Sequence, residues 1–292
     1  SNNTITGSGD VRLVTDIATS TTTLTGVTNV TANGFFCSIQ SAIDLANDDD
    51  IIIVAPGTYA EDLFLHKRLS LRGANYGINP NVGPRVPETI LTPFESDPDN
   101  TSTIYIDPAG SGSTIDGFTF NGDNPLLTSG VLINEGLTDV DAVEAISAYE
   151  GLSNVTVQNN IIKNYPYAAI DFYNYYNAGN STTGNLITNN LIKDIRPTGG
   201  YGIGVIIYNN CYTNITNNVM DGTMVGVQTG NFYKADAGIS HSISNNTITS
   251  YRKGIWYNSS YSNATKHNIE NNIINTYTGA PNNWGIHVTS IG

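Results

Sequence analysis

The chain has little charge and almost no sulfur. Only 13% of its 292 residues are charged, and it contains two cysteines, two methionines and two tryptophans. Cys37 and Cys211 lie far apart in a repetitive sequence, so we expect two buried free thiols rather than a disulfide. The four histidines are too dispersed for a transition-metal triad. No metal site is therefore predicted, and calcium bound by acidic loops is the one cofactor left open.

Positive charge is the scarcest property of all. Lys and Arg together number 12 against 25 for Asp and Glu, giving a formal net charge of −13. Such a field repels phosphate backbones, anionic lipid headgroups and, unless cations bridge them, polyuronates. No apolar run is long enough to span a bilayer. We therefore expect neither nucleic-acid partners nor membrane insertion.

Asn, Thr, Ser and Gly are abundant, which is typical of a turn-rich β protein. Asn-Asn pairs recur at steps of 30, 28, 28 and 26 residues, each inside a similar apolar frame. A fixed period of this size predicts stacked repeats, in which each repeat forms one coil. The pairs are Asn159-Asn160, Asn189-Asn190, Asn217-Asn218, Asn245-Asn246 and Asn271-Asn272.

The asparagine pairs have a structural explanation. Asn tolerates left-handed backbone and hydrogen-bonds its own turn, so one Asn can close each coil at a corner. Identical amides stacked about 4.8 Å apart can also bond to one another along the axis. We therefore predict a structural ladder rather than a ligand groove, formed by Asn160, Asn190, Asn218, Asn246 and Asn272.

The N-terminal region contains one clear amphipathic helix, over residues 38–46. Its apolar residues recur with helical spacing, and the strand pattern Ile51-Ile52-Ile53-Val54 follows. An open stack of coils exposes apolar core at its end, so we assign this helix as a cap. A second helix is predicted from Asp139 to Tyr149, because Val140, Val143 and Ile146 are spaced by three.

These elements predict one domain over residues 1–292. Its expected parts are N-terminal strands and cap helix (1–50), first coils with an irregular excursion (51–134), a helical insertion (135–152), and regular Asn-Asn coils (153–292).

The N-terminal segments resemble a known superfamily. Cys37-Ser38-Ile39-Gln40-Ser41-Ala42-Ile43-Asp44, residues 51–61 and Leu69-Ser70-Leu71-Arg72-Gly73-Ala74 are similar to the cap and first coils of pectin-lyase-like proteins. Pectin methylesterases and many secreted bacterial proteins begin in this way. The resemblance implies an all-β, right-handed parallel β-helix with an N-terminal amphipathic cap helix. It implies little about activity, because this scaffold supports many functions.

Strand alternation in the regular coils predicts an outward-facing set of candidate binding residues. Tyr, Trp, Asp, Gln and His on one face are typical of sugar binding, although aromatic residues also cover half-exposed sheets. Arg252 and Lys253 beside Trp256 are the best basic cluster in the coils. The candidate ligand-binding residues are Asp171, Tyr173, Tyr208, Gln228, Arg252, Lys253, Trp256 and His287.

Known activities of the superfamily find little support in the motifs. The Leu-Gly-Arg-Pro-Trp segment of pectin methylesterases is absent, and the one Arg-Pro pair is Arg196-Pro197. Polygalacturonases use paired carboxylates with a Gly-His-Gly segment, which is also absent. Asp48-Asp49-Asp50 is interpreted as a solvated turn. No catalytic residue is assigned from the sequence.

The sequence therefore favours a non-catalytic extracellular or cell-surface β-helix module for adhesion, assembly or glycan contact. Its partner would be a glycan or a cell-surface protein, and the chain would be part of a longer one. The alternative is a polysaccharide lyase or glycoside hydrolase acting on a lateral groove. A trimeric tail-fibre or capsid-associated β-helix is a third possibility.

Overall fold

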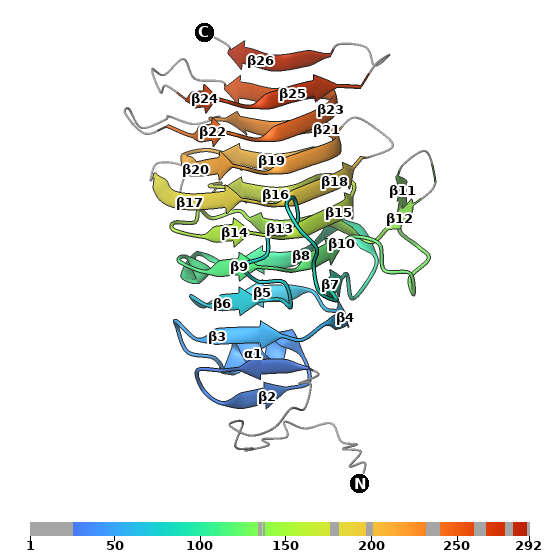
Figure 1. The fold of residues 1–292 in the computed structure, drawn as a ribbon, viewed down its shortest axis with the longest axis vertical. Coiled ribbons are helices and arrows are strands. Elements are labelled where there is room, and N and C mark those ends of the chain that lie inside the picture. Colours follow the sequence, from blue (N-terminus) through green and yellow to red (C-terminus); the bar gives the residue numbers. More distant parts are fainter. Residues whose placement is uncertain are drawn as a thin grey trace.

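The computed structural model describes residues 26–133, 136, 138–175, 181–196, 201–231, 240–259, 267–277 and 283–290. The chain winds into a stack of coils in which each strand pairs with strands of the coils before and after it (Figure 1). Nearly all pairings are parallel, and the two antiparallel ones in the stack lie at its N-terminal end. The fold class predicted from the sequence, an all-β parallel β-helix, is confirmed.

The first column of strands forms one ten-stranded sheet. In spatial order it contains β2 (Gly34–Phe36), β1 (Val27–Asn29), β3 (Ile51–Val54), β6 (Ser70–Arg72), β9 (Thr114–Asp116), β14 (Thr156–Gln158), β17 (Thr182–Thr188), β20 (Cys211–Thr216), β22 (Ser242–Ser244) and β24 (Asn268–Glu270).

The second and third columns join into one sheet of 14 strands, because two long strands turn the corner between them. These are β21 (Val219–Gly230) and β23 (Thr247–Ser259). The second column also contains β4 (Gly57–Ala60), β7 (Thr89–Thr92), β10 (Thr119–Asn121), β15 (Ile161–Tyr165), β18 (Leu191–Ile195) and β25 (Ile273–Thr276). The third also contains β5 (Leu63–Leu65), β8 (Asp97–Ile106), β13 (Ala142–Ala148), β16 (Ala168–Tyr173), β19 (Ile203–Tyr208) and β26 (Trp284–Ser290).

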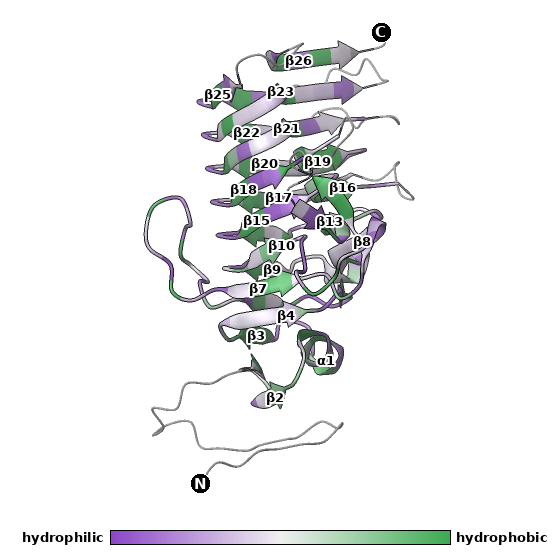
Figure 2. Cartoon of the chain, turned by 90° about the vertical axis from the view of Figure 1, so that its right-hand side faces the viewer, coloured by the Kyte–Doolittle hydropathy of each residue, from purple (hydrophilic) through white to green (hydrophobic). Residues whose placement is uncertain are grey.

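The interior of the coils is a continuous apolar core. In the third column Ile146, Ile170, Val205, Val227 and Ile255 stack in register and are fully buried. Figure 2 shows apolar segments recurring at corresponding places from coil to coil. Because β-branched residues suit both strand backbone and dense packing, this repetition fixes which side of each strand faces inward.

The cap helix predicted from the sequence is α1 (Ile39–Leu45). Ser38 is its N-cap and accepts a hydrogen bond from the Ser41 amide, as the capping rule requires. Ile39, Ala42 and Ile43 are buried in the main core. The Glu61 carboxylate accepts from the first two helical amides, so the helix is held to the second column as well.

Both members of each asparagine pair have a defined role. The first has left-handed backbone, with φ between 54° and 57° at Asn159, Asn189, Asn217, Asn245 and Asn271. The second is buried in the first four pairs and half-buried in the last. From Asn190 onward, its side-chain oxygen accepts from the amide and side chain of its counterpart one coil earlier.

The bonds repeat almost unchanged along the ladder. The Asn190 Nδ2 donates to the Asn218 Oδ1 at 3.0 Å, and the Asn190 amide donates to the same oxygen at 2.9 Å. The Asn218 Nδ2 donates to the Ile187 carbonyl of the coil before it and to the Thr216 carbonyl of its own corner. Equivalent contacts join Asn160 to Asn190, and Asn246 to Asn218 and Asn272. Each ladder residue therefore satisfies backbone groups in a corner from which water is excluded.

Two sequence predictions are wrong. The predicted helix over 139–149 is replaced by strands, β12 (Thr138–Val140), paired antiparallel with β11 (Val131–Ile133), and β13. The spacing by three does not mark one face, because Val140 lies on β12, Val143 lines a surface cavity and Ile146 is in the core. The second wrong prediction is the burial of Cys37, which is exposed; Cys211 is buried as predicted, and both are free thiols.

A short 3-10 helix spans Pro108–Gly110.

We predict that Asn218→Ala destabilises the fold by about 2 kcal/mol or more, since it leaves the Asn190 amide and the Ile187 carbonyl buried without partners. Thermal melts followed by circular dichroism would measure the loss. The matched control is Asn217→Gly, which keeps a residue suited to left-handed backbone and should change stability far less. Equal losses in the two variants would contradict the ladder.

Candidate functional site

The outer face of the third column carries two straight rows of side chains. Strand register makes the members of each row nearest neighbours, one per coil. The first row is Ser102, Glu144, Ala168, Ile203, Val225, Lys253 and Trp284. The second row is Tyr105, Ser147, Asp171, Ile206, Gln228, Trp256 and His287.

The two rows lie three residues apart on each strand because the strands bend between them. Ala169 and Ile170 are consecutive, yet both belong to the apolar core. Ala168 and Asp171 on either side of them belong to the outer face. This corner interrupts the two-residue alternation, which is why simple alternation finds the second row but not the first.

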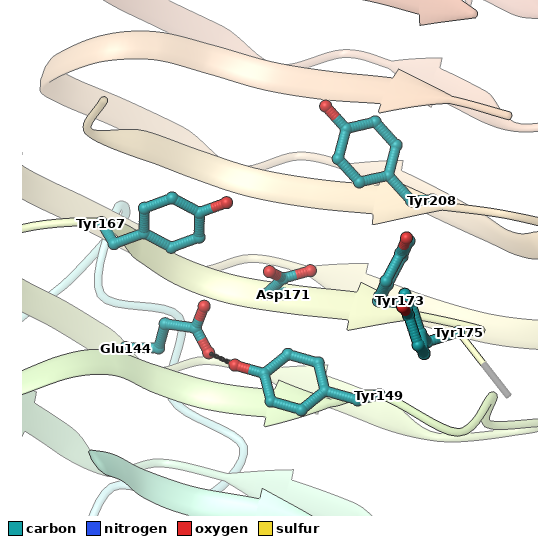
Figure 3. A pocket seen from close by; sticks show the side chains of 7 residues that line it. All are labelled: Glu144, Tyr149, Tyr167, Asp171, Tyr173, Tyr175 and Tyr208. Atoms are coloured by element: carbon teal, nitrogen blue, oxygen red, sulfur yellow. Dashed lines mark hydrogen bonds between the residues drawn. The ribbon is translucent and has the colours of Figure 1, made fainter. Parts of the chain in front are cut away.

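Glu144 and Asp171 form a buried carboxyl pair at the N-terminal end of the rows. They project from the adjacent strands β13 and β16, and their relative exposures are only 1% and 6%. The Tyr149 hydroxyl donates to the Glu144 Oε2 at 2.6 Å (Figure 3). The Ser102 hydroxyl donates to the same oxygen at 3.3 Å. One carboxylate oxygen of Asp171, Oδ1, is buried without a hydrogen-bond partner in the structure.

Burial makes this pair hold a proton near neutrality. Desolvation raises the pKa of Glu144 to about 7, against the lowering effect of hydrogen bonds from its neighbours. Desolvation also raises the pKa of Asp171 well above its usual value, and the charge of Glu144 raises it further. Two carboxyl groups in contact in a low-dielectric site cannot both ionise easily. The pair therefore contains one carboxylic acid and one carboxylate over an extended pH range.

Tyrosines surround the carboxyl pair. They line a cavity of about 440 Å³ together with Glu144 and Asp171 (Figure 3). Burial raises the pKa of Tyr149, Tyr167 and Tyr208, so these hydroxyls stay protonated and act as hydrogen-bond donors or acceptors. The lining tyrosines are Tyr149, Tyr167, Tyr173, Tyr175 and Tyr208.

The cavity is the centre of a longer groove along the helix axis. On the N-terminal side a second cavity of about 320 Å³, lined by Asp99 and Asn100, also reaches Glu144. On the C-terminal side a third cavity of about 280 Å³ is lined by Gln228, Arg252 and Trp256, among others. The Gln228 side chain donates to the Tyr208 hydroxyl and so connects the first cavity to the third.

The floor between the carboxyl pair and the third cavity is apolar. Ala168, Ile203, Ile206 and Val225 form a hydrophobic cluster of their own, separate from the core of the coils. Tyr167, Tyr208 and Trp256 pack against this cluster. An apolar floor with aromatic walls and polar groups at intervals suits the mixed surface of a sugar.

The structure divides the residues that the sequence singled out into two groups. Asp171, Tyr173 and Tyr208 line the central cavity, whereas Gln228, Arg252, Lys253 and Trp256 line the third. His287 lies beyond the groove, with its ring 6.1 Å from that of Trp256 and 5.0 Å from that of Trp284.

Glu144 is the functional residue that sequence reasoning missed. The segment around it was predicted as a helix, so its position beside Asp171 could not be inferred. The same wrong helix prediction hid the position of Tyr149, whose hydroxyl donates to Glu144. Once the register of the coils is known, Ser147 lies beside Asp171, and Glu144, three residues before Ser147, faces the same cavity.

Among the residues that the structure describes, no group of three or more His, Cys, Asp or Glu side chains could hold a metal ion. In the same part of the chain, no helix has the length and apolar character needed to cross a membrane.

Comparison with known proteins bears on the fold. Residues 192–292 match a family described as a protein of unknown function, DUF1565. No curated protein has a significantly similar sequence. The chain is a parallel β-helix, as its stacked columns show, and its N-terminal segments resemble those of pectin-lyase-like proteins.

Two solved structures align with the chain at 13% identity, over 87% of its length. One is full-length tailspike protein 2 from an Escherichia coli O157:H7 bacteriophage, with a TM-score of 0.40. The other is the enzymatically active domain of tailspike protein 2 from bacteriophage CBA120, with a TM-score of 0.39. The alignments cover 38% and 43% of those chains. At this level of similarity the tailspikes indicate nothing about a substrate.

We predict that Glu144→Gln raises stability at pH 8. The folded-state pKa of Glu144 is raised from 4.5 to about 7, so the folded protein holds a proton that the unfolded chain releases. The protonated Glu144 contributes on the order of a few kcal/mol to the free energy of unfolding. This contribution is fully present below about pH 4.5 and is lost as the pH rises through 7.

Urea denaturation of wild type and Glu144→Gln between pH 4 and pH 8 would measure the effect. The stability advantage of the variant should grow with pH, because contributions from groups remote from Glu144 cancel in the difference and loss of the Glu144 charge also relieves the repulsion of Asp171. Glu270→Gln, which changes an exposed carboxylate on β24, is the control and should show no such trend. A constant difference across the range would contradict the raised pKa.

Proposed function

We propose that this protein is a glycan-cleaving enzyme, a glycoside hydrolase, whose groove binds a polysaccharide along the helix axis. The observation that carries the proposal is the buried Glu144–Asp171 pair inside a tyrosine-lined cavity. Burying two carboxyl groups together costs free energy, and such arrangements are concentrated at functional sites. The alternative of a non-catalytic rod gives no reason for this cost.

The pair can supply both proton transfers of hydrolysis. The carboxylic acid donates its proton to the glycosidic oxygen as the bond from the anomeric carbon to that oxygen breaks. The carboxylate accepts a proton from the water whose oxygen bonds to the anomeric carbon. The pair ends with the same number of protons, now exchanged between its members. Both carboxyl groups line the same cavity, so a glycosidic bond held there is within reach of both.

Hydrolysis fits the site better than β-elimination. A lyase needs a base that removes a proton beside a uronate carboxylate. Burial raises the pKa of Tyr149, Tyr167 and Tyr208 in the cavity, so these tyrosines are poor bases. The cations of the groove, Arg252 and Lys253, project from β23, three strands beyond Asp171.

A polymeric substrate follows from the length of the groove. Cavities on both sides of the carboxyl pair leave room for sugar units in two directions, which suits cleavage within a chain. Such polysaccharides are found outside cells and on their surfaces, so we place the protein there. The acidic net charge of −13 agrees with a protein that must avoid nucleic acids.

We predict that Glu144→Gln and Asp171→Asn each lower cleavage by about 10²- to 10⁴-fold, the usual contribution of general acid–base catalysis. Purified neutral and uronate-containing polysaccharides would serve as substrates, with release of reducing ends as the readout. Ultraviolet absorbance of unsaturated sugars would reveal elimination instead. Binding by the two variants should persist, because neither removes the apolar floor.

The control is again Glu270→Gln, which should retain full activity. A glycan that binds the wild type in the groove but is never cleaved would contradict hydrolysis and support a binding module. Cleavage that survives in both variants would show that the carboxyl pair is not catalytic.

A further inference from the structure

The two carboxyl groups of the central cavity have unequal surroundings. The Oε2 of Glu144 accepts from the Tyr149 hydroxyl at 2.6 Å, and Figure 3 shows that hydroxyl aimed at the carboxyl group. The same oxygen accepts from the Ser102 hydroxyl at 3.3 Å. The Ser147 hydroxyl donates to the Ser102 oxygen at 2.7 Å, so the Ser102 proton is free to point toward Glu144. Hydroxyl donors therefore converge on one oxygen of Glu144.

The surroundings of Asp171 are different. Its Oδ1 is buried without a hydrogen-bond partner in the structure, and the residue is only 6% exposed. A buried oxygen without a donor costs more free energy in a charged carboxylate than in a neutral carboxylic acid. Hydrogen bonds to a carboxylate, by contrast, favour its charged form. The shared proton is therefore more stable on Asp171, and the negative charge is more stable on Glu144.

The pKa shifts agree in direction with this difference. Burial raises the pKa of Glu144 to about 7, and hydrogen bonds from Tyr149 and Ser102 oppose that rise. Burial also raises the pKa of Asp171 well above its usual value, and the charge of Glu144 raises it further, so these two effects add.

The other titratable groups around the pair are neutral tyrosines and one further carboxyl group. Burial raises the pKa of Tyr167 and Tyr208, and Asp99 faces Glu144 from the neighbouring cavity. None of the described residues that line these two cavities is Lys, Arg or His. Hydroxyl donors rather than positive charges therefore decide where the proton lies.

We propose that Tyr149 is a positioning residue that keeps the shared proton on Asp171, which makes Asp171 the general acid and Glu144 the general base. This inference rests on the proposed function, because it assigns the roles within the same hydrolysis. Asp171 gives its proton to the glycosidic oxygen as the bond from that oxygen to the anomeric carbon breaks. Glu144 takes a proton from the water whose oxygen bonds to the anomeric carbon.

The hydrogen bond from Tyr149 also resets the site. After one hydrolysis Glu144 is protonated and Asp171 is charged, which is the less stable placement of the same proton. Transfer of that proton from Glu144 to Asp171 restores the starting state and needs no other reactant. Because the donors on Glu144 favour its charged form, this transfer is downhill. Each turnover then begins with the acid and the base in place.

Infrared difference spectroscopy would locate the proton without a substrate. At pH 8 ordinary Asp and Glu side chains are ionised, so the carbonyl band of a carboxylic acid reports on this pair. We expect the band in wild type and its loss in Asp171→Asn, where Glu144 is ionised. Absence of the band from wild type would overturn the inference, and so would a band that persists in Asp171→Asn.

Tyr149→Phe tests the positioning role. Loss of the donor should raise the pH at which Glu144 ionises, from about 7, by about one unit or more, since a hydrogen bond to a charged group is worth that much. The acid band would be followed between pH 5 and pH 10. Tyr173→Phe, which removes another hydroxyl from the same cavity, is the matched control and should leave the midpoint unchanged. Equal midpoints in wild type and Tyr149→Phe would remove the role of Tyr149.

A glycan that wild type hydrolyses would connect the proton to the reaction. Its rate of cleavage should rise with pH as Glu144 ionises, and Tyr149→Phe should move this rise upward by the same amount as the infrared midpoint. Hydrolysis by wild type together with an acid band that survives Asp171→Asn would leave the proposed function standing and remove these roles. The expected spectra without hydrolysis of any glycan would keep the proton on Asp171 and overturn the proposed function.

Discussion

In-register stacking of the coils is the constraint on which the rest of this structure depends. Parallel strands align equivalent positions of successive coils, so any residue type repeated at one position becomes a row. The asparagine ladder holds the register at one corner, because each amide bonds to its counterparts in the neighbouring coils. A slip of one residue would break these buried bonds and turn the apolar core outward. The geometry of the groove therefore depends on a corner whose asparagines do not line its three cavities.

The same stacking explains how a polar site can exist on so regular a scaffold. Core positions repeat almost without change, whereas the outward rows vary from coil to coil. In the first row, the variation runs from Glu144 through the apolar Ile203 to Lys253. Acid, apolar floor and cation thus succeed one another along the axis. A solenoid can in this way place side chains of different chemistry at successive coils without changing its fold.

The sequence predicted most of the fold and about half of the site, for physical reasons that can be stated. An Asn-Asn pair in the sequence marks a corner of the coil directly, because the left-handed backbone and the buried side-chain amide bonds there both favour asparagine. Alternation likewise found the row that contains Asp171 and Trp256. It failed at Glu144 because Ala145 and Ile146, which follow it, both face inward, and because the spacing of Val140, Val143 and Ile146 resembles a helix. No local pattern distinguishes the two cases, because the difference lies in pairing with distant coils.

The free-energy cost of burying Glu144 and Asp171 together is an argument for a catalytic groove over one that only binds glycans. Glycan contact needs aromatic faces and hydrogen bonds, which the tyrosines and the apolar floor already provide. It does not need two carboxyl groups, almost wholly removed from water, that share a proton at neutral pH. Such a pair lowers stability above neutral pH, and an apolar or amide residue in its place would be tolerated by the fold. A structural role therefore leaves the pair unexplained, whereas the proposed hydrolysis would use it for proton transfer.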